Sequence, residues 1–309
     1  MHVYPDYYKE FSCIAGECKH NCCIGWEIDI DEDTAERYKN IGGEFGKRLE
    51  NNISKGENPH FILGERERCP FLNGQNLCDI ICELGEGALC TICKEHPRFH
   101  SELPDRIESG LGLTCESAGR IILGKKSPLV LIGEGETDDE IIILRNKALA
   151  VLINREKRLD ERISDMLMLV GGTLPKKSLA EWAEIYLSLE RLDGEWTKLL
   201  EKVRDVGENI DFSTFNIYMA ERTCEFEQLA CYFIYRHFAN SSTVEDAAAV
   251  GAFAALSCKI IAAIGASILS EKGEFTFDDM VELCRIYSSE IEYSEENMSE
   301  LLYILNPDF

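Results

Sequence analysis

The sequence predicts a mainly α-helical protein in which a cysteine-rich N-terminal region with little strand packs on an all-helical C-terminal bundle. Three observations predict this fold class. Ten of the fourteen cysteines precede residue 116, helical periodicity dominates from about residue 139, and strands do not alternate with helices. We place the boundary in the Gly- and Glu-rich loop 124–138. This divides the chain into a cysteine-rich, metal-binding region, 1–125, and a helical domain, 139–309.

The helical domain carries start and stop signals typical of amphipathic helices. Ser178 and Glu181 have the spacing of a capping box, and Trp182 and Tyr186 then fall on one helical face. The dipeptide Asp193-Gly194 ends this pattern. The same criteria predict helices at 141–153, 196–206, 213–238, 244–270, 278–290 and 295–305.

One helical segment is long and apolar enough to cross a bilayer. Residues 247–269 contain a single charge, Lys259, which lies near the centre of the segment. A charge at that depth is costly in lipid, and Ala and Gly dominate the segment. We therefore expect a buried helix of a soluble bundle, and no membrane partner.

Composition indicates a protein that does not need disulfides to fold. The chain has 309 residues, 45% of them hydrophobic, and its first residues lack the apolar run of a secretory signal. We therefore expect a cytoplasmic protein whose clustered thiols bind metal or act in redox chemistry. The formal charge of −24 argues against nucleic acid as a partner, because binding to phosphates requires basic residues.

The cysteines divide into two classes by their neighbours. The four late ones lie in apolar helical patterns and are predicted to pack in the core: Cys224, Cys231, Cys258 and Cys284. The early ones lie among Gly, Pro, Asn and charged residues, so packing does not explain them. We predict that the metal ligands are Cys13, Cys18, Cys22, Cys23, Cys69, Cys78, Cys90, Cys93 and Cys115. Cys82 is left out because the residues around it are helix-like.

The pattern leaves the metal open. Nine thiols exceed the four that one zinc ion or one four-iron cluster needs, so either two centres exist or some thiols only support the site. A zinc finger using His96 and His100 is disfavoured by Pro97 between them. A thioredoxin-like use of Cys90 and Cys93 lacks its βαβ context. Oligomeric state is not predicted.

The order of motifs in residues 1–125 resembles the flagellin lysine-N-methylase family, which is related to the "CxxCxxCC" zinc- or iron-chelating proteins. The resemblance rests on the early thiols and on the segments Cys22-Cys23-x-Gly25-Trp26-x-Ile28-x-Ile30-Asp31, Cys69-Pro70-Phe71-Leu72, Leu77-Cys78-x-Ile80, Cys90-x-x-Cys93 and His96-Pro97-Arg98-Phe99. Cys115 also matches, and Cys82 does not. The helical remainder is compatible but carries no motif on which we rely.

The resemblance implies methyl transfer from S-adenosylmethionine to lysine ε-amines of flagellin, with an iron–sulfur cluster taking part; a 4Fe-4S cluster is expected, and zinc remains an alternative. Lysine must lose its proton to react, so a base is needed, and His96, Glu27 and Asp29 are candidates. Trp26 and Arg98 are candidates for binding the cofactor. The alternative functions are a non-catalytic zinc- or iron-chelating module and a metal-stabilised interaction protein.

Overall fold

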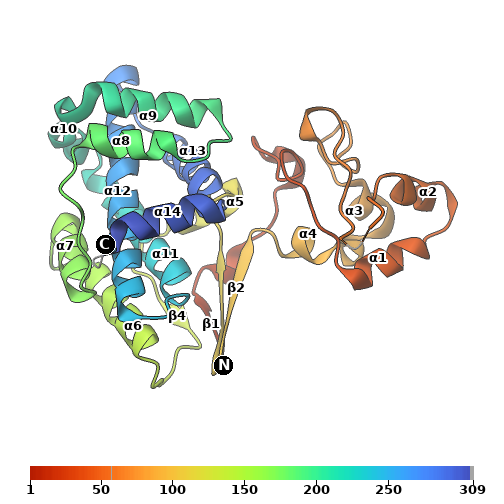
Figure 1. Ribbon diagram of the computed structural model, residues 1–309, viewed down its shortest axis with the longest axis horizontal. Helices are drawn as coiled ribbons and strands as arrows, with labels where there is room; N and C mark the ends of the chain where they lie inside the picture. Colours follow the sequence, from red (N-terminus) through yellow and green to blue (C-terminus); the bar gives the residue numbers. More distant parts are fainter. Residues whose placement is uncertain (57, 307–309) are drawn as a thin grey trace. The chain divides into compact units, whose positions relative to one another are not determined.

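The computed structural model describes residues 1–56 and 58–306, and the chain is mainly helical, as predicted. It divides into two compact units (Figure 1). The helical unit comprises residues 1–11, 100–114 and 118–309, and the cysteine unit comprises residues 12–99 and 115–117.

The helical unit is built around one long helix, α12 (Val244–Lys272), of which 19 residues are buried. Figure 1 shows the other helices of this unit arranged about α12. Thr243 and Asp246 form a capping box at its start, and Gly273 ends it in the left-handed conformation. The remaining elements of the unit are α5 (Glu116–Gly124), α6 (Glu140–Leu152), α7 (Leu159–Leu169), α8 (Leu179–Ser188), α9 (Gly194–Val206), α10 (Phe212–Tyr218), α11 (Thr223–Phe238), α13 (Phe277–Tyr287), the π-helix η7 (Ser288–Glu292) and α14 (Glu295–Leu305).

Two expectations about these helices are confirmed and one is wrong. Helix α12 is the one described helix long and apolar enough to span a membrane, and 89% of its most apolar window is buried inside the protein, as in a core helix. The capping box of Ser178 and Glu181 starts α8. The single helix predicted at 213–238 is instead two, α10 and α11, because Arg222 has a non-helical backbone and bonds to Glu225 and to the carbonyl of Phe275.

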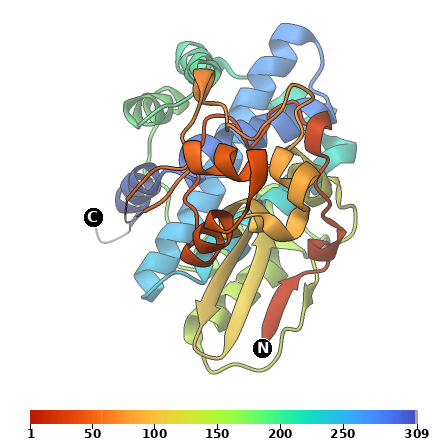
Figure 2. The same cartoon turned by 90° about the vertical axis from the view of Figure 1, so that its right-hand side faces the viewer.

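A four-stranded sheet lies in the helical unit except for the first two residues of one strand, and the sequence analysis missed it. Its strands are β1 (His2–Pro5), β2 (Arg98–Leu103), β3 (Arg106–Leu111) and β4 (Leu131–Ile132), in the order β2-β3-β1-β4. The N-terminal strand β1 pairs in parallel with β3 and antiparallel with β4. Figure 2 shows β1, in red, beside the two yellow-orange strands. The predicted boundary loop 124–138 therefore contains a strand. The two units also do not meet at this loop, because residues 1–11 and 100–114 belong to the helical unit.

Buried ion pairs tie this sheet to the helices. Arg145 of α6 donates two hydrogen bonds to Glu108 of β3, at 2.8 and 2.9 Å, and a third to Glu134. Arg106 reaches Glu134 at 2.6 Å. Both arginine side chains are fully buried. Carboxylates therefore compensate both buried charges, and Glu108 binds Arg145 in a bidentate contact.

The cysteine unit has short helices and a small apolar core. Its helices are α1 (Glu32–Lys39), α2 (Gly43–Asn51), α3 (Asp79–Leu84) and α4 (Thr91–Glu95). Rings form the middle of the core: those of Phe61 and Phe71 lie 5.3 Å apart, and Tyr38 packs against Phe61. The Tyr38 hydroxyl donates to the carbonyl of Ala88 at 2.7 Å.

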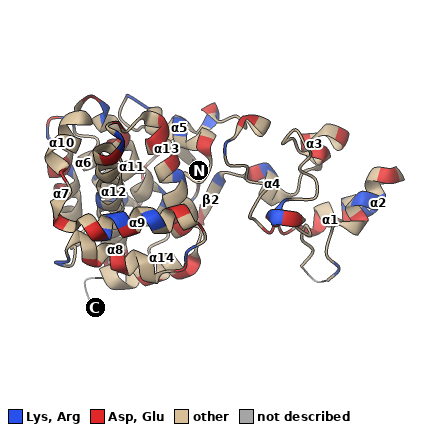
Figure 3. Ribbon diagram, turned by 90° about the horizontal axis from the view of Figure 1, so that it is seen from above, with Lys and Arg blue, Asp and Glu red and all other residues tan. Residues whose placement is uncertain are grey.

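Acidic residues are spread over the helices of both units (Figure 3), in keeping with the net charge of −24. Many basic residues neutralise a neighbouring carboxylate, for example Arg48 with Asp79 at 2.7 Å. The surplus of acidic residues repels phosphate backbones, as the sequence analysis argued.

Candidate metal centre in the cysteine unit

Five of the predicted ligands come together in the core of the cysteine unit. Cys69 and Cys90 are buried members of this core, and Cys23, Cys78 and Cys93 are half-buried and packed against it. They come from four separate stretches of the chain. We call these five cysteines the thiol cluster.

Backbone pairing brings these stretches together. The amide of Cys69 donates to the carbonyl of Cys23 at 2.8 Å. Leu72 and Cys78 face each other across an antiparallel bridge. These contacts place Cys23, Cys69 and Cys78 around one point of the core, although 46 residues separate the first two along the chain.

Asp31 fixes the remaining stretch. Its carboxylate accepts from the amide of Thr34 at 3.0 Å, which caps α1, and from the amide of Thr91 at 2.8 Å, at the start of α4. One side chain thus anchors two helix starts, one of which carries Cys90 and Cys93. The sequence analysis named Asp31 as a motif residue without assigning it this role.

Backbone amides point at two of the sulfurs. Burial raises the pKa of the Cys69 thiol, and hydrogen bonds from the amides of Phe71 and Leu72 oppose that rise. Burial likewise raises the pKa of Cys78, opposed by the amides of Ile81 and Ile80. Amides aimed at a sulfur stabilise the thiolate, which is the form that binds metals. Both sulfurs are therefore prepared to lose their protons to a metal.

Two neighbouring pairs of thiols share protons. A hydrogen bond from Cys93 lowers the pKa of Cys90 to about 7, and the same bond raises the pKa of Cys93. Cys22 and Cys23 behave in the same way: the bond lowers the pKa of Cys22 and raises that of Cys23. Each pair holds one thiolate readily and a second only when a cation replaces the remaining proton.

The sulfurs of the thiol cluster come close in a pair, Cys90 with Cys93, but not as a set of three. Among the described residues, no three of the five sulfurs lie within 4.8 Å of one another. Four sulfurs bound about 2.3 Å from one tetrahedral ion would be about 3.8 Å apart. A single zinc ion and a larger cluster thus remain the two alternatives that the sequence analysis named.

Three further predicted ligands form a second group. Burial raises the pKa of Cys18 to about 12, with further contributions from Cys115, Cys13 and Cys22. These thiols are therefore within electrostatic reach of one another. The amide of Lys19 donates to the buried carboxylate of Glu116 at 3.0 Å. The contact holds the Cys18 loop beside Cys115.

The other sequence candidates lie in two places. The ring of His96 packs edge-on against Trp26, with centroids 6.4 Å apart. Burial lowers the pKa of His96 to about 4, so the ring is neutral near pH 7. Arg98 begins β2 and is half-buried. The carboxylates of Glu27 and Asp29 are exposed and lie with His60.

The late cysteines largely follow expectation. Cys231, Cys258 and Cys284 are buried, as predicted. Cys224 is only half-buried, because it lies in the first turn of α11, where the amine of Lys126 approaches its sulfur at 3.5 Å. Cys82, which the prediction left out, is exposed.

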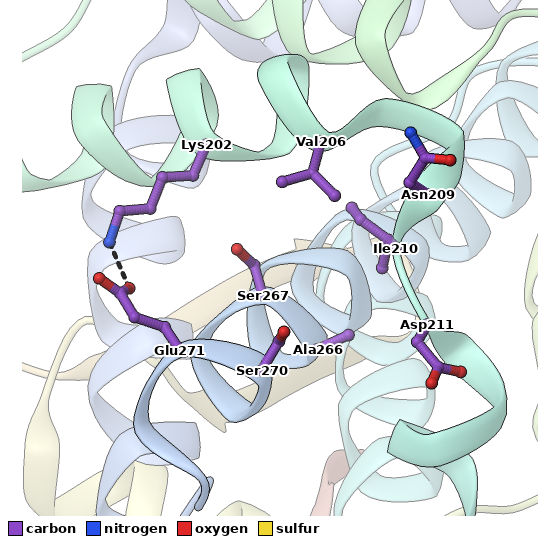
Figure 4. A pocket seen from close by; sticks show the side chains of 9 residues that line it. All are labelled: Lys202, Val206, Asn209, Ile210, Asp211, Ala266, Ser267, Ser270 and Glu271. Atoms are coloured by element: carbon purple, nitrogen blue, oxygen red, sulfur yellow. Dashed lines mark hydrogen bonds and ion pairs between the residues drawn. The ribbon is translucent and has the colours of Figure 1, made fainter.

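The helical unit has a surface pocket of about 280 Å³ between α9 and α12 (Figure 4). Val206, Ile210 and Ala266 give it an apolar lining. At its rim Lys202 and Glu271 form an ion pair at 2.5 Å. The lining also includes four polar side chains, those of Asn209, Asp211, Ser267 and Ser270, so the pocket is of mixed character.

The sequence was compared with protein families, and the family match lies in the helical unit. Residues 177–308 match the family described as the FliB lysine N-methylase C-terminal domain. The flagellar biosynthetic protein FliU of Salmonella muenchen is 29% identical over 148 residues, which are 46% of this chain and 87% of that protein. No solved structure matches the chain.

Two lysine-N-methylases, from Salmonella typhimurium and Salmonella choleraesuis, are each 27% identical over 134 residues. The match covers 41% of this chain and 33% of each of those proteins. The chain thus matches only a third of the length of these two relatives. The C-terminal region is thus similar to the C-terminal domain of FliB lysine N-methylases, in agreement with the family resemblance that the sequence analysis found in residues 1–125.

Proposed function

We propose that this protein transfers a methyl group from S-adenosylmethionine to lysine ε-amines of flagellin, and that the thiol cluster holds an iron–sulfur cluster needed for the reaction. The observation that carries the proposal is the convergence of Cys23, Cys69, Cys78, Cys90 and Cys93 in one small core. The family and the flagellar names of the relatives support the choice of substrate.

The donor set fits an iron–sulfur cluster better than a zinc ion. Thiolates are the usual ligands of such clusters, and four are needed for one 4Fe-4S centre. The amides aimed at Cys69 and Cys78 favour thiolates at these positions, and the resemblance of residues 1–125 to flagellin lysine-N-methylases favours an iron–sulfur cluster over zinc. The group of Cys13, Cys18 and Cys115, with Cys22 beside it, has the composition to hold a second centre.

When bound, a cluster with an open iron position can take up the amino and carboxylate groups of S-adenosylmethionine. The other tasks fall to the chain's own side chains. We assign Arg98 to a carboxylate of the methyl donor and Trp26 to its ring, since a guanidinium group binds carboxylates and an indole offers a flat apolar face.

Methyl transfer demands a neutral amine. A lysine has a pKa of about 10.4 in water, so the site must remove its proton before the nitrogen lone pair can attack. A carbon–nitrogen bond then forms as the carbon–sulfur bond breaks, leaving S-adenosylhomocysteine. We assign proton acceptance to His96, whose ring is neutral and buried against Trp26. We expect the reaction to take place in the cytoplasm, where thiols stay reduced.

The test begins with protein purified without air. Iron and acid-labile sulfide should be present in near-equal amounts, with broad visible absorbance. Incubation with S-adenosylmethionine and flagellin should then add single methyl groups to lysines, detected by mass spectrometry of peptides. The Cys90→Ser variant should lose both iron and methylation, whereas Cys82→Ser, at an exposed thiol, should keep both.

Two results would overturn parts of the proposal. A colourless protein with stoichiometric zinc would replace the iron–sulfur assignment with a zinc centre. An intact cluster without any gain of mass on flagellin would reject the methyltransferase and leave a metal-binding module as the function.

A further inference from the structure

A second group of metal-ligating side chains lies outside the thiol cluster. In the extended stretch 27–30, Ile28 and Ile30 pack toward the apolar core, whereas Glu27 and Asp29 are exposed. Alternate residues of an extended chain point to opposite faces. Both carboxylates therefore lie on the face opposite the one that packs on the thiol cluster.

A third ligand comes from a stretch paired with this one. Asp29 and His60 face each other across an antiparallel bridge. The amide of Phe61 donates to the carbonyl of Ile28, and the amide of Ile30 donates to that of Pro59. These bonds flank the pair, so Asp29 and His60 form a non-hydrogen-bonded pair, the kind whose side chains lie closest. Glu27 then sits diagonally across from His60.

The His60 ring is held in one orientation. Its Nδ1 lies 3.0 Å from the hydroxyl of Ser54 and 3.2 Å from the carbonyl of Asn58. The amide of His60 also donates to the Ser54 hydroxyl, at 2.9 Å. The Asn58 carbonyl only accepts, so it selects the tautomer with the proton on Nδ1, and in that neutral tautomer Nε2 bears a lone pair.

The Nε2 atom of His60 faces the two carboxylates. Nε2 lies 3.9 Å from a carboxylate oxygen of Glu27, and one ligand atom each from Glu27, Asp29 and His60 all lie within 4.8 Å of one another. Two carboxylates and an imidazole nitrogen around one point repel each other unless a proton or a metal cation lies between them. A histidine fixed by a carbonyl on its other nitrogen is also the usual arrangement of a metal-binding imidazole.

We propose that Glu27, Asp29 and His60 bind one first-row divalent cation, such as Mn²⁺ or Fe²⁺, at a site separate from the thiol cluster. One imidazole and two carboxylates form a hard donor set that suits these ions and leaves positions open for water. Donor atoms bound about 2.1 Å from one ion are at most about 4.2 Å apart. The exposed carboxylates therefore need to move by less than about 1 Å to close on the ion.

Mn²⁺ is the probe, because it is hard and competes poorly for thiolates. The full chain is loaded with iron and sulfide without air, and Mn²⁺ is then added while electron paramagnetic resonance measures the free ion. One equivalent should bind. Pulsed measurements should show coupling to a single imidazole nitrogen, and this coupling should vanish in His60→Gln.

The carboxylate variants Glu27→Gln and Asp29→Asn should each weaken Mn²⁺ binding at least tenfold without changing iron content. The matched control is Glu44→Gln, which removes an exposed charge of the same unit that pairs only with Lys47 one turn away. It should bind Mn²⁺ as the parent does. Circular dichroism checks that each variant is folded.

Two outcomes would overturn the site. The first is that the parent protein, with its thiol cluster filled, binds no Mn²⁺. The second is that Glu27→Gln and His60→Gln bind Mn²⁺ as well as the parent does, which would leave the three side chains as a surface ion pair only. Neither result depends on methylation of flagellin, so the test is independent of the proposed function.

Discussion

The two units are held together by different means. In the helical unit, α12 alone buries 19 of its 29 residues, and the helices around it complete a continuous apolar core. The described core of the cysteine unit is a cluster of nine buried residues, two of which are cysteines. Apolar burial can therefore stabilise the helical unit. The core of the cysteine unit is small, and units with such a core usually need disulfides or bound metal to be stable. We therefore expect a bound metal centre to contribute to the stability of the cysteine unit.

The largest expected effect is that of replacing one buried sulfur of the thiol cluster. Cys90→Ser removes a buried sulfur at the start of α4, the helix that also carries Cys93. Because metal binding and folding are coupled in such units, we expect loss of most of the iron and faster hydrogen exchange across residues 12–99. Exchange in α12 should be unchanged.

The matched control is Cys258→Ala, which alters a buried sulfur of the helical unit. It should keep the full iron content and lose only the modest stability of a small buried side chain. If Cys90→Ser kept its iron while Cys258→Ala lost it, the division of the cysteines into ligands and core residues would be wrong.

The second prediction concerns the stability that a buried carboxylate gives to the helical unit. Glu227 of α11 is buried and accepts hydrogen bonds from Arg155 and from the buried Arg162, the latter at 2.6 Å. Glu227→Gln leaves the Arg162 charge without compensation, so unfolding free energy should fall by about 3–5 kcal/mol. Chemical denaturation followed at Trp182 and Trp196 would measure this.

An exposed pair of the same unit provides the comparison. Arg158 and Asp160 form an ion pair at 3.1 Å in which both side chains are more than two-thirds exposed. Asp160→Asn should therefore change stability very little, since water already screens the pair. Equal effects of the two substitutions would show that burial does not set the strength of these contacts.

The sequence predicted those elements whose patterns lie within a few neighbouring residues, and it missed those that depend on pairing between distant segments. Helix α8 was predicted because its capping box and its periodic apolar residues lie within a few positions of each other. The sheet was missed because β1 pairs with β3, about a hundred residues away, and no local pattern encodes that register. The buried pair of Arg145 and Glu108 depends on the same pairing.

The site shows the same division. Spacing alone indicated that the early cysteines bind metal, but it did not separate the thiol cluster from the group of Cys13, Cys18 and Cys115. The arrangement of Glu27, Asp29 and His60 could not be found from the sequence, because His60 reaches the carboxylates only through backbone pairing across about thirty residues. The residues that carried the family resemblance lie in the cysteine unit, whereas the family match covers 177–308.

The third prediction compares one capping residue from each unit. Asp31 caps two helix starts in the cysteine unit, and Asp211 caps one, that of α10, in the helical unit. Asp31→Ala should cost about 1–2 kcal/mol and loosen the segment of Cys90 and Cys93, whereas Asp211→Ala should cost less and leave iron content unchanged. Iron analysis and thermal unfolding measure the two effects.

The effect of Asp31 should also depend on pH. Burial raises the pKa of Asp31, but hydrogen bonds from Thr91 and Thr34 outweigh it and hold the pKa well below its usual range. A lowered pKa contributes stability that is complete above the unfolded value, about 3.9, and is lost as pH falls below it toward the folded value. The difference between the parent and Asp31→Ala should therefore shrink only below about pH 4.

The smallest expected effect is at Cys82. Its thiol is exposed on α3 one turn beyond Cys78, and its amide is already bonded to the Cys78 carbonyl within the helix. Cys82→Ser should keep iron content, visible absorbance and unfolding free energy within error, because it removes neither a buried sulfur nor a packed side chain. Loss of iron in this variant would mean that Cys82 turns inward when metal binds, and the thiol cluster would then have a sixth member.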